Sequence, residues 1–490
     1  MSIRTTADIS PGELPDEAAR LLADGHRLAL VSARQEAHGF GLAYVFVAGD
    51  PDRRTELRLR LPPEQPAVPS LAHLSFPAGR FEREIRDLYG ITPLGHPLPR
   101  RLVRHHHWPR GWYPMRTDAG APPSFGDPEG PYPFVTVEGQ GVYEIPVGPV
   151  HAGLIEPGHF RFSVVGETII KLKARLWFVH KGIEKLFEGR QPGDGLELAE
   201  RVSGDTSVGH ALAYCLAVEE ATRTPVSEQA QRLRAVLLEL ERLYNHVTDL
   251  GAICNDVGFG ILNAQTGRIR EQLLRTNAEV TGHRLLRGGV RLGGADLRAL
   301  PDPERLHAIS ADVAEIVELA LGHTVVADRF TGTAVLSGDA ARDLGTLGYV
   351  ARASGLDLDA RRDHPFTDLG DFTPARRTSG DVLARFQIRA EEIATSIALI
   401  THLVGGSAVA PAGRLPAERS SSGVGLVEGW RGTIAHRVEL APDGTITRMK
   451  IVDPSFFNWP ALPVALNGAI VPDFPLVNKS FNLSYAGNDL

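Results

Sequence analysis

A short polar group, Ser203-Gly-Asp-Thr206, interrupts a stretch of otherwise helical character. Apolar residues recur around it at roughly helical spacing, from Leu198 to Val218. Ser, Asp and Thr compete with helical hydrogen bonds and Gly adds chain entropy, so tertiary contacts must hold this group in place. Two hydroxyls and a carboxylate so close together could bind a ligand through hydrogen bonds or move a proton.

Thiol chemistry is nearly absent from the chain. There are two cysteines, Cys215 and Cys254, and they do not form a Cys-x-x-Cys pair. An iron–sulfur cluster usually needs about four thiolates, and a structural zinc site about four Cys or His ligands. We therefore expect both cysteines to be buried and inert, and we expect no cluster on this chain alone.

Composition sets broad limits on the class of protein. The 490 residues, 43% hydrophobic and 23% charged, are enough for two or three globular domains. A formal net charge of −7 gives no indication of nucleic-acid binding. No apolar run approaches the roughly 20 residues of a membrane span, and the N-terminus has no apolar signal core. The chain is expected to be cytoplasmic, with any membrane attachment made through partners.

The pattern of the chain predicts an α+β protein. Residues 1–120 are expected to form a small α/β domain, with strands starting near Arg27, Gly41 and Thr55 and helices over 18–23 and 78–89. Residues 121–145 are rich in Pro and Gly and are predicted to be a linker. Residues 146–490 are predicted to be mainly helical with peripheral strands, including a long helical tract over 196–285.

Two groups of motifs resemble known families. The run from Phe81 to Gly90, Phe-Glu-Arg-Glu-Ile-Arg-Asp-Leu-Tyr-Gly, is followed by Gly-His-Pro and Arg-Arg-Leu and resembles the 30-kDa subunit of respiratory complex I. A solvated helix would explain its charges but not the later Gly-His-Pro. The runs that contain His151, His159 and Glu184 resemble the complex I 49-kDa subunit and the large subunits of membrane-bound nickel–iron hydrogenases. The whole chain resembles their fusion, as in formate hydrogenlyase-type complexes.

The resemblance also identifies four altered positions. In the hydrogenases, cysteines bind the metal pair where this chain has Ser203, Thr206, Ser484 and Gly487. Nickel and iron in such a site need soft thiolate ligands. We therefore expect no metal at this site and no hydrogenase activity, and we expect Ser203, Thr206, Ser484 and His151 to line the former metal cavity.

Other site residues are implied by the same resemblance. Glu184 matches a glutamate that is thought to move protons, although it could equally stabilise the start of a helix. His159 lies near the position of a quinone-binding histidine, while the matching tyrosine position is Gly204.

Two arginines and one aspartate complete the predicted site. Arg361 and Arg362 are expected near the cavity, the alternative being surface pairs with Asp359 and Asp363. Asp205 is expected to pair with one of these arginines or to accept a proton, and the alternative is a helix cap.

The function implied is that of a core electron-transfer subunit in a peripheral complex on the cytoplasmic side of the membrane, related to NADH-quinone oxidoreductases. The resemblance implies an iron–sulfur small subunit of the 20-kDa type carrying a 4Fe–4S cluster, a ferredoxin-like subunit and membrane antiporter-like subunits as partners. The acceptor would be quinone or another molecule. The alternative is a non-catalytic scaffold that couples redox partners to the membrane subunits.

Overall fold

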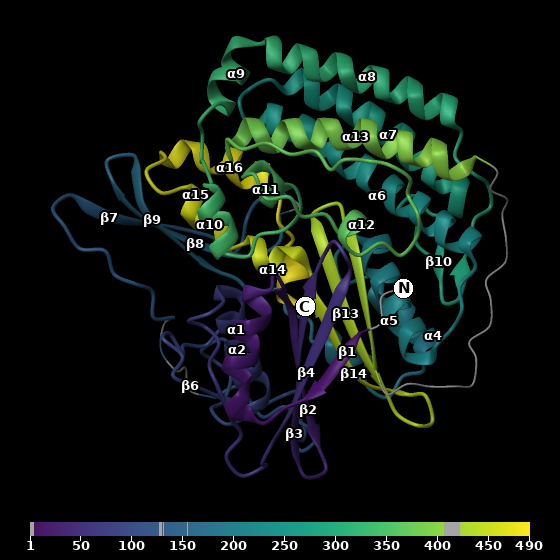
Figure 1. Ribbon diagram of the computed structural model, residues 1–490. Helices are drawn as coiled ribbons and strands as arrows, with labels where there is room; N and C mark the ends of the chain where they lie inside the picture. The colour runs from purple at the N-terminus through teal and green to yellow at the C-terminus, as the bar shows by residue number, and fades with distance from the viewer. Residues whose placement is uncertain (1–3, 127–129, 131, 154, 406–421) are drawn as a thin grey trace.

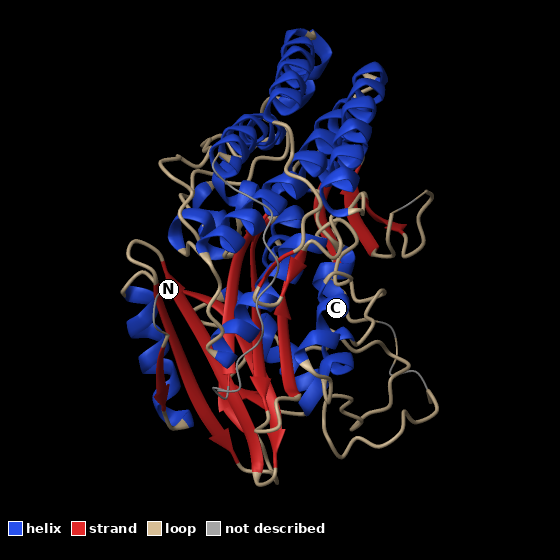
Figure 2. Cartoon of the chain, turned by 90° about the vertical axis from the view of Figure 1, so that its right-hand side faces the viewer, coloured by secondary structure: helices blue, strands red, loops and turns tan. Residues whose placement is uncertain are grey.

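The computed structural model describes residues 4–126, 130, 132–153, 155–405 and 422–490. Helices and strands are mixed along the chain, which confirms the predicted α+β class. Figure 2 shows most of the helices gathered at one end of the molecule and most of the strands at the other. In the part of the chain that is described, no helix combines the length and apolarity of a bilayer span.

The N-terminal region is built on a four-stranded sheet in the order β1-β4-β3-β2. Its strands are β1 (Thr5–Asp8), β2 (Arg27–Glu36), β3 (Gly39–Ala48) and β4 (Arg53–Leu61). β1 runs parallel to β4, and the other pairs are antiparallel. The accompanying helical elements are η1 (Pro11–Glu13), α1 (Leu14–Ala23) and α2 (Phe76–Tyr89). The predicted strands are confirmed, and both predicted helices begin earlier than the sequence pattern indicated.

Helix α2 carries the motif that resembles the 30-kDa subunit. It begins after Ser75 with Pro77 in its first turn and ends at Tyr89, where it is capped by Gly90, whose positive φ of 77° suits a residue without a Cβ. Most of its residues are buried, including the acidic Glu82, Glu84 and Asp87. A solvated helix is therefore the wrong interpretation of these charges, because they face the interior of the protein.

Short strands follow the first sheet. β5 (Ala67–Pro69) pairs in parallel with β6 (Thr92–Leu94). β7 (Val142–Val147), β8 (His159–Val165) and β9 (Thr168–Arg175) form an antiparallel sheet that projects from the body of the molecule (Figure 1).

The helical part begins with two short helices and then a break. α3 (Ile183–Phe187) and α4 (Pro192–Ala199) precede residues 200–206, and α5 (Ser207–Thr222) follows them. The polar group Ser203–Thr206 thus lies between helices rather than inside one, as its poor helix propensity requires. The remaining elements up to residue 404 are α6 (Glu228–Asn255), α7 (Gly260–Thr281), β10 (Val290–Arg291), β11 (Gly294–Ala295), α8 (Pro303–Gly322), α9 (Thr324–Phe330), α10 (Gly338–Asp343), α11 (Gly348–Ala353), α12 (Ala360–Asp363) and α13 (Val382–Val404).

The β12–β14 sheet joins the two halves of the molecule. Its antiparallel strands are β12 (Ser422–Gly429), β13 (Gly432–Leu440) and β14 (Ile446–Val452). Helix α5 packs closely on β12, and the glycines of β12 allow this approach. A Cβ at Gly423 or Gly425 would lie 2.0 Å from a carbonyl oxygen of the helix. β13 and β14 also contact β2, so the yellow and purple strands lie side by side in Figure 1. The chain then passes through α14 (Pro454–Asn458), α15 (Ala461–Ala465), η2 (Val471–Asp473), α16 (Phe474–Phe481) and α17 (Tyr485–Asp489).

Candidate functional site

The four positions that hold cysteines in the hydrogenases lie around the break between α4 and α5 and around the start of α17. Ser203, Thr206 and Ser484 are all at least 95% buried, with 2%, 2% and 5% of their surface exposed. The hydroxyls of Ser203 and Ser484 are 2.8 Å apart, and Gly487 N–H donates to Ser484 Oγ at 2.9 Å. The structure therefore brings Ser203 and Ser484 into contact, and Thr206 bonds instead to Asp205 and to the indole of Trp430.

The donor set at these positions does not fit a nickel–iron pair. Hydroxyls replace three of the four thiolates that such a site needs, and the fourth position, Gly487, has no side chain. A Cβ at Gly487 would lie 2.5 Å from the carboxyl carbon of Asp453, so a larger side chain there would force that carboxylate to move. Among the described residues, no group of three or more His, Cys, Asp or Glu side chains is arranged to hold a metal ion.

A bidentate ion pair occupies the centre of this site. Arg431 donates to the two carboxylate oxygens of Asp205 at 2.7 Å each. The guanidinium is 4% exposed, whereas the Asp205 side chain is 41% exposed, so the pair has one buried and one accessible member. Burial opposes ionisation of Asp205, but Arg431 outweighs this effect and lowers the pKa of the carboxyl below its usual value.

Arg431 also bonds to Asn482 and is therefore fixed from two directions. Its Nε donates to the Asn482 carbonyl at 2.5 Å, and Trp430 Nε1, from the adjacent position, donates to Thr206 Oγ1 at 3.1 Å. Trp430 and Arg431 form the tip of the β12–β13 hairpin, which packs against Gly348. A hairpin tip is ordinarily exposed, so no local pattern indicated that this arginine would lie in the site.

The predicted pairing of Asp205 with Arg361 or Arg362 is wrong. Arg361 Nη2 donates to Asp359 at 2.7 Å, and its Nη1 lies 3.2 Å from Glu239, in a separate buried network. Arg362 is 38% exposed and pairs with Asp357 and Asp363. The alternative of surface pairs with Asp359 and Asp363 is correct in its partners, because both arginines lie in α12, which begins directly after its cap, Asp359. It is correct in exposure only for Arg362, because Arg361 is buried.

Sequence reasoning did not predict two features beside the site, the acid Glu241 and a hydrogen-bonded row that starts from His210. Glu241 of α6 accepts hydrogen bonds from the N–H groups of Val208 and Gly209, at 2.7 and 3.0 Å, at the start of α5. Burial raises the pKa of Glu241 to about 8, so this acid can hold a proton at neutral pH. The signal available in the sequence was a charged group, Glu239, Glu241 and Arg242, within the apolar run of α6, where a buried carboxylate is costly unless it is bonded or protonated.

A buried hydrogen-bonded row starts from His210. Its Nε2 donates to Asp453 Oδ2 at 3.0 Å, and its Nδ1 lies 2.9 Å from Nε2 of His436. With both rings neutral, the His436 N–H donates to His210, which leaves Nδ1 of His436 as an acceptor without a partner among the described residues. Burial places the pKa of His436 well below its usual value, which favours the neutral ring.

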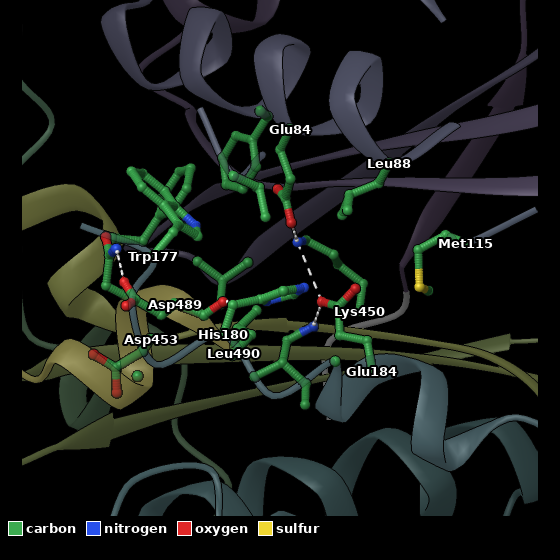
Figure 3. Close-up of a pocket in the computed structure, with 18 residues that line it drawn as sticks. Glu84, Leu88, Met115, Trp177, His180, Glu184, Lys450, Asp453, Asp489 and Leu490 are labelled. Carbon is green, nitrogen blue, oxygen red and sulfur yellow. Dashed lines mark hydrogen bonds and ion pairs between the residues drawn. The ribbon is translucent and has the colours of Figure 1, made fainter. Parts of the chain in front are cut away.

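Glu184 is held by strand β14, which leads directly to Asp453. Its carboxylate accepts from Arg448 Nη2 at 2.7 Å and from the Ile451 N–H at 2.9 Å, and it lies 3.2 Å from Lys450 Nζ. Glu184 is in the first turn of α3, but these partners belong to β14 and not to its own helix. Glu184, Asp453 and Gly487 line the same small cavity (Figure 3).

The two predicted histidines lie close to the start of β8, whose first residue is His159. His151 Nε2 is 2.7 Å from the Gly158 carbonyl, and His159 Nδ1 is 3.1 Å from the Gly148 carbonyl. Gly158 packs against the ring of Tyr485, where a Cβ would lie 2.5 Å from a ring carbon. Both hydrogen bonds hold the histidines to this segment and not to Asp205 or Glu184.

Comparisons with known proteins agree with this architecture. Residues 8–123 match the family of the 30-kDa subunit of respiratory-chain NADH dehydrogenase, residues 256–421 match the 49-kDa subunit, and residues 181–250 match nickel-dependent hydrogenases. The chain is 33% identical to formate hydrogenlyase subunit 5 of Escherichia coli (strain K12), over 88% of this chain and 79% of the relative. It is 30% identical to the fused C/D component of the NADH-quinone oxidoreductase of Phocaeicola vulgatus, over 79% of this chain and 80% of the relative.

The fold has also been seen in a solved assembly. The chain superposes on a chain of the membrane-bound sulfane sulfur reductase, an archaeal respiratory membrane complex, with a TM-score of 0.64. This match has 23% identity and covers 72% of this chain and 99% of the other, so it supports the fold. Together the comparisons place the chain in the class of large subunits of complex I-like and hydrogenase-like complexes. The chain belongs to the branch of this family in which the 30-kDa-type and 49-kDa-type parts are fused.

Proposed function

We propose that this chain is the core electron-transfer subunit of a membrane-bound oxidoreductase complex that works without a nickel–iron site. Electrons would come from a 4Fe–4S cluster on an iron–sulfur small subunit of the 20-kDa type and pass to quinone or another acceptor. A ferredoxin-like subunit and membrane antiporter-like subunits would complete the complex, which would be peripheral on the cytoplasmic side of the membrane. Relatives that carry the names formate hydrogenlyase and NADH-quinone oxidoreductase support this proposal.

The observation that carries the proposal is the Asp205–Arg431 pair. It stands among the former ligand positions and has one member, Asp205, that is 41% exposed. A fixed guanidinium stabilises negative charge that develops on a reduced acceptor, and an accessible carboxylate is suited to exchanging a proton with it. Glu241 would supply a further group that holds a proton beside it.

A scaffold role has one specific observation in its favour. The hydroxyls of Ser203 and Ser484 bond to each other, and Thr206 and Arg431 are bonded to their neighbours, so the groups at this site satisfy one another. A site of this kind can persist for its structural contribution alone. The two roles differ in whether Asp205 is needed for turnover.

The test uses the native complex purified with its partners. Iron, nickel and bound quinone are measured together, and electron transfer to a quinone analogue is followed for the wild type, Asp205→Asn and a surface control, Glu17→Gln. We expect iron on the partner, no stoichiometric nickel, and loss of transfer in Asp205→Asn with normal assembly. Stoichiometric nickel on this chain would overturn the proposal, and full transfer in Asp205→Asn would favour the scaffold.

A complementary test restores the thiols. We expect the combined variant Ser203→Cys, Thr206→Cys, Ser484→Cys and Gly487→Cys to take up no stoichiometric nickel. The reason is that Arg431 already occupies the site and a side chain at position 487 would have to displace the Asp453 carboxylate. Elemental analysis of the purified variant checks this expectation.

A further inference from the structure

A small cavity lies where α2 of the N-terminal domain faces β14 and the C-terminal helix α17 (Figure 3). Its volume is about 20 Å³, which is enough for roughly one water molecule. Such a site retains a water only if several polar groups face it. The titratable side chains that line it are Glu84, His180, Glu184, Lys450, Asp453 and Asp489.

Glu84 lines this cavity and carries an unsatisfied atom. Its Oε1 accepts from Lys450 Nζ at 2.6 Å, whereas Oε2 is buried and has no hydrogen-bond partner among the described residues. The residue as a whole is 7% exposed. An unpaired buried carboxylate oxygen is costly. A water in the cavity, a proton on the oxygen, or both in turn would remove that cost.

Glu184, the neighbouring carboxylate, has more partners than Glu84. Glu184 is held by Arg448 and by the Ile451 N–H in addition to Lys450, so its charge is well compensated. Burial raises the pKa of Glu184, but the cations outweigh this effect and lower it. Glu84 shares the single ammonium of Lys450, and burial raises its pKa. Of the two carboxylates that contact Lys450, Glu84 is therefore the one that gains a proton first.

Other charged and titratable groups lie around Glu84. They are Arg80 and Tyr89 on its own helix, Glu184 on α3, Arg448 and Lys450 on β14, and His180 and Asp489 across the cavity. The central four, Glu84, Glu184, Arg448 and Lys450, carry no net charge when all are ionised. One added proton makes this group of four positive, which would compensate a negative charge arriving nearby.

We propose that Glu84 is a proton-accepting site that the two domains complete together, and that a water molecule in the cavity delivers the proton to its Oε2. Uptake forms one O–H bond on Oε2, takes the proton from solvent, and moves no electron to or from the carboxylate. Lys450 remains bonded to Glu184 throughout. The coupling of this uptake to reduction of the complex rests on the function proposed above. It gives the fused N-terminal domain a direct part in that function.

The experiment is infrared difference spectroscopy of the native complex. In the oxidised complex, titration over a wide pH range is expected to reveal the bands of the buried carboxylic acids, Glu241 among them, and one of these bands is expected to be absent in Glu84→Gln. The matched control is Glu56→Gln, which removes a buried interface carboxylate already paired with arginines and should leave the band unchanged. Glu84→Asp, which keeps a carboxyl group, should shift the band without removing it. Persistence of the unshifted band in Glu84→Gln would overturn the assignment.

Reduction of the complex tests the coupling. Proton uptake on chemical reduction is expected to fall by one per complex in Glu84→Gln and to be unchanged in Glu56→Gln. Equal uptake in the wild type and Glu84→Gln would overturn the coupling. A complex that transfers no electrons would refute the proposed function and not the site, because the titration of the oxidised complex needs no electron transfer.

Discussion

Two buried ionic contacts join the N-terminal domain to the β12–β14 sheet, and they differ in the cations they use. Glu56 on β4 is 0% exposed and accepts from Arg437 Nη2 at 2.9 Å and Arg58 Nε at 2.7 Å, and Arg4 pairs with it as well. Glu84 on α2 has the one ammonium of Lys450, which it shares with another carboxylate.

The difference in cations produces opposite acidities at one interface. Burial alone would raise the pKa of Glu56, but its arginines lower it to about 2. Burial prevails for Glu84, whose pKa is raised. Guanidinium groups present several fixed donors, whereas an ammonium is a point charge. A carboxylate that is paired with several arginines therefore stays ionised, whereas one that shares a lysine can still gain or lose a proton.

The largest effect is expected when the saturated contact is broken. Glu56→Ala leaves Arg437 buried without this partner, and we expect the free energy of unfolding to fall by roughly 3–5 kcal/mol. Chemical denaturation of the chain measures the loss. The pH dependence has a defined sign: the unfolded carboxyl binds more protons between pH 4.5 and about 2, so the contribution of Glu56 is present above that window and is lost as the pH falls through it.

A loss below 1 kcal/mol in Glu56→Ala would contradict this interpretation of the contact. In that case Glu439, which also pairs with Arg437, would be sufficient to hold the guanidinium.

A smaller effect is expected at the partly exposed pair. Asp205→Ala removes the carboxylate from Arg431, which keeps its bond to the Asn482 carbonyl. Because Asp205 is 41% exposed, solvent screens the pair, and we expect a loss of about 1–3 kcal/mol, the cost of leaving buried donors unpaired. The melting temperature of Asp205→Ala beside that of Asp205→Asn checks this. Equal, near wild-type values for both would show that the pair contributes little to folding.

These ion pairs also show what the sequence could and could not predict. Local patterns predicted the strands of the first sheet, and the family motifs predicted that Ser203, Thr206 and Ser484 meet. The partners that decide their chemistry lie far away in the chain: Asp205 and Arg431 are 226 positions apart, and Glu84 and Lys450 are 366 apart. Residue spacing carries no information about such contacts, so arginines close to Asp359 were assigned to the site in place of one at a buried hairpin tip.

A still smaller change is expected at Glu84, with a sign that depends on pH. Glu84→Gln keeps the volume and leaves Lys450 paired with Glu184, so we expect a loss of at most about 1 kcal/mol near neutral pH. Because the folded pKa is raised, the native state retains a proton that the unfolded state has released above pH 4.5. The contribution of Glu84 to stability is therefore complete below pH 4.5 and is lost as the pH rises through the folded pKa.

The measurement for Glu84 is the difference in unfolding free energy between the wild type and Glu84→Gln across pH. We expect it to change in favour of the variant as the pH rises. The same difference for Glu56→Gln should be flat above pH 4.5. A flat difference for Glu84→Gln as well would mean that Glu84 is ionised throughout and belongs to the same class as Glu56.

The smallest effect is expected at a surface pair that serves as the reference for the others. Arg20 donates to Glu17 at 2.8 Å on α1, and the two side chains are 61% and 38% exposed. Exposed pairs three residues apart on a helix contribute only about 0.3–0.5 kcal/mol, and added salt should weaken the contribution further. Denaturation of Arg20→Ala at low and high salt measures it. If this pair cost as much as Glu56 or Asp205, burial would not be what separates the contacts, and the contrast between arginine-saturated and lysine-shared carboxylates would lose its physical basis.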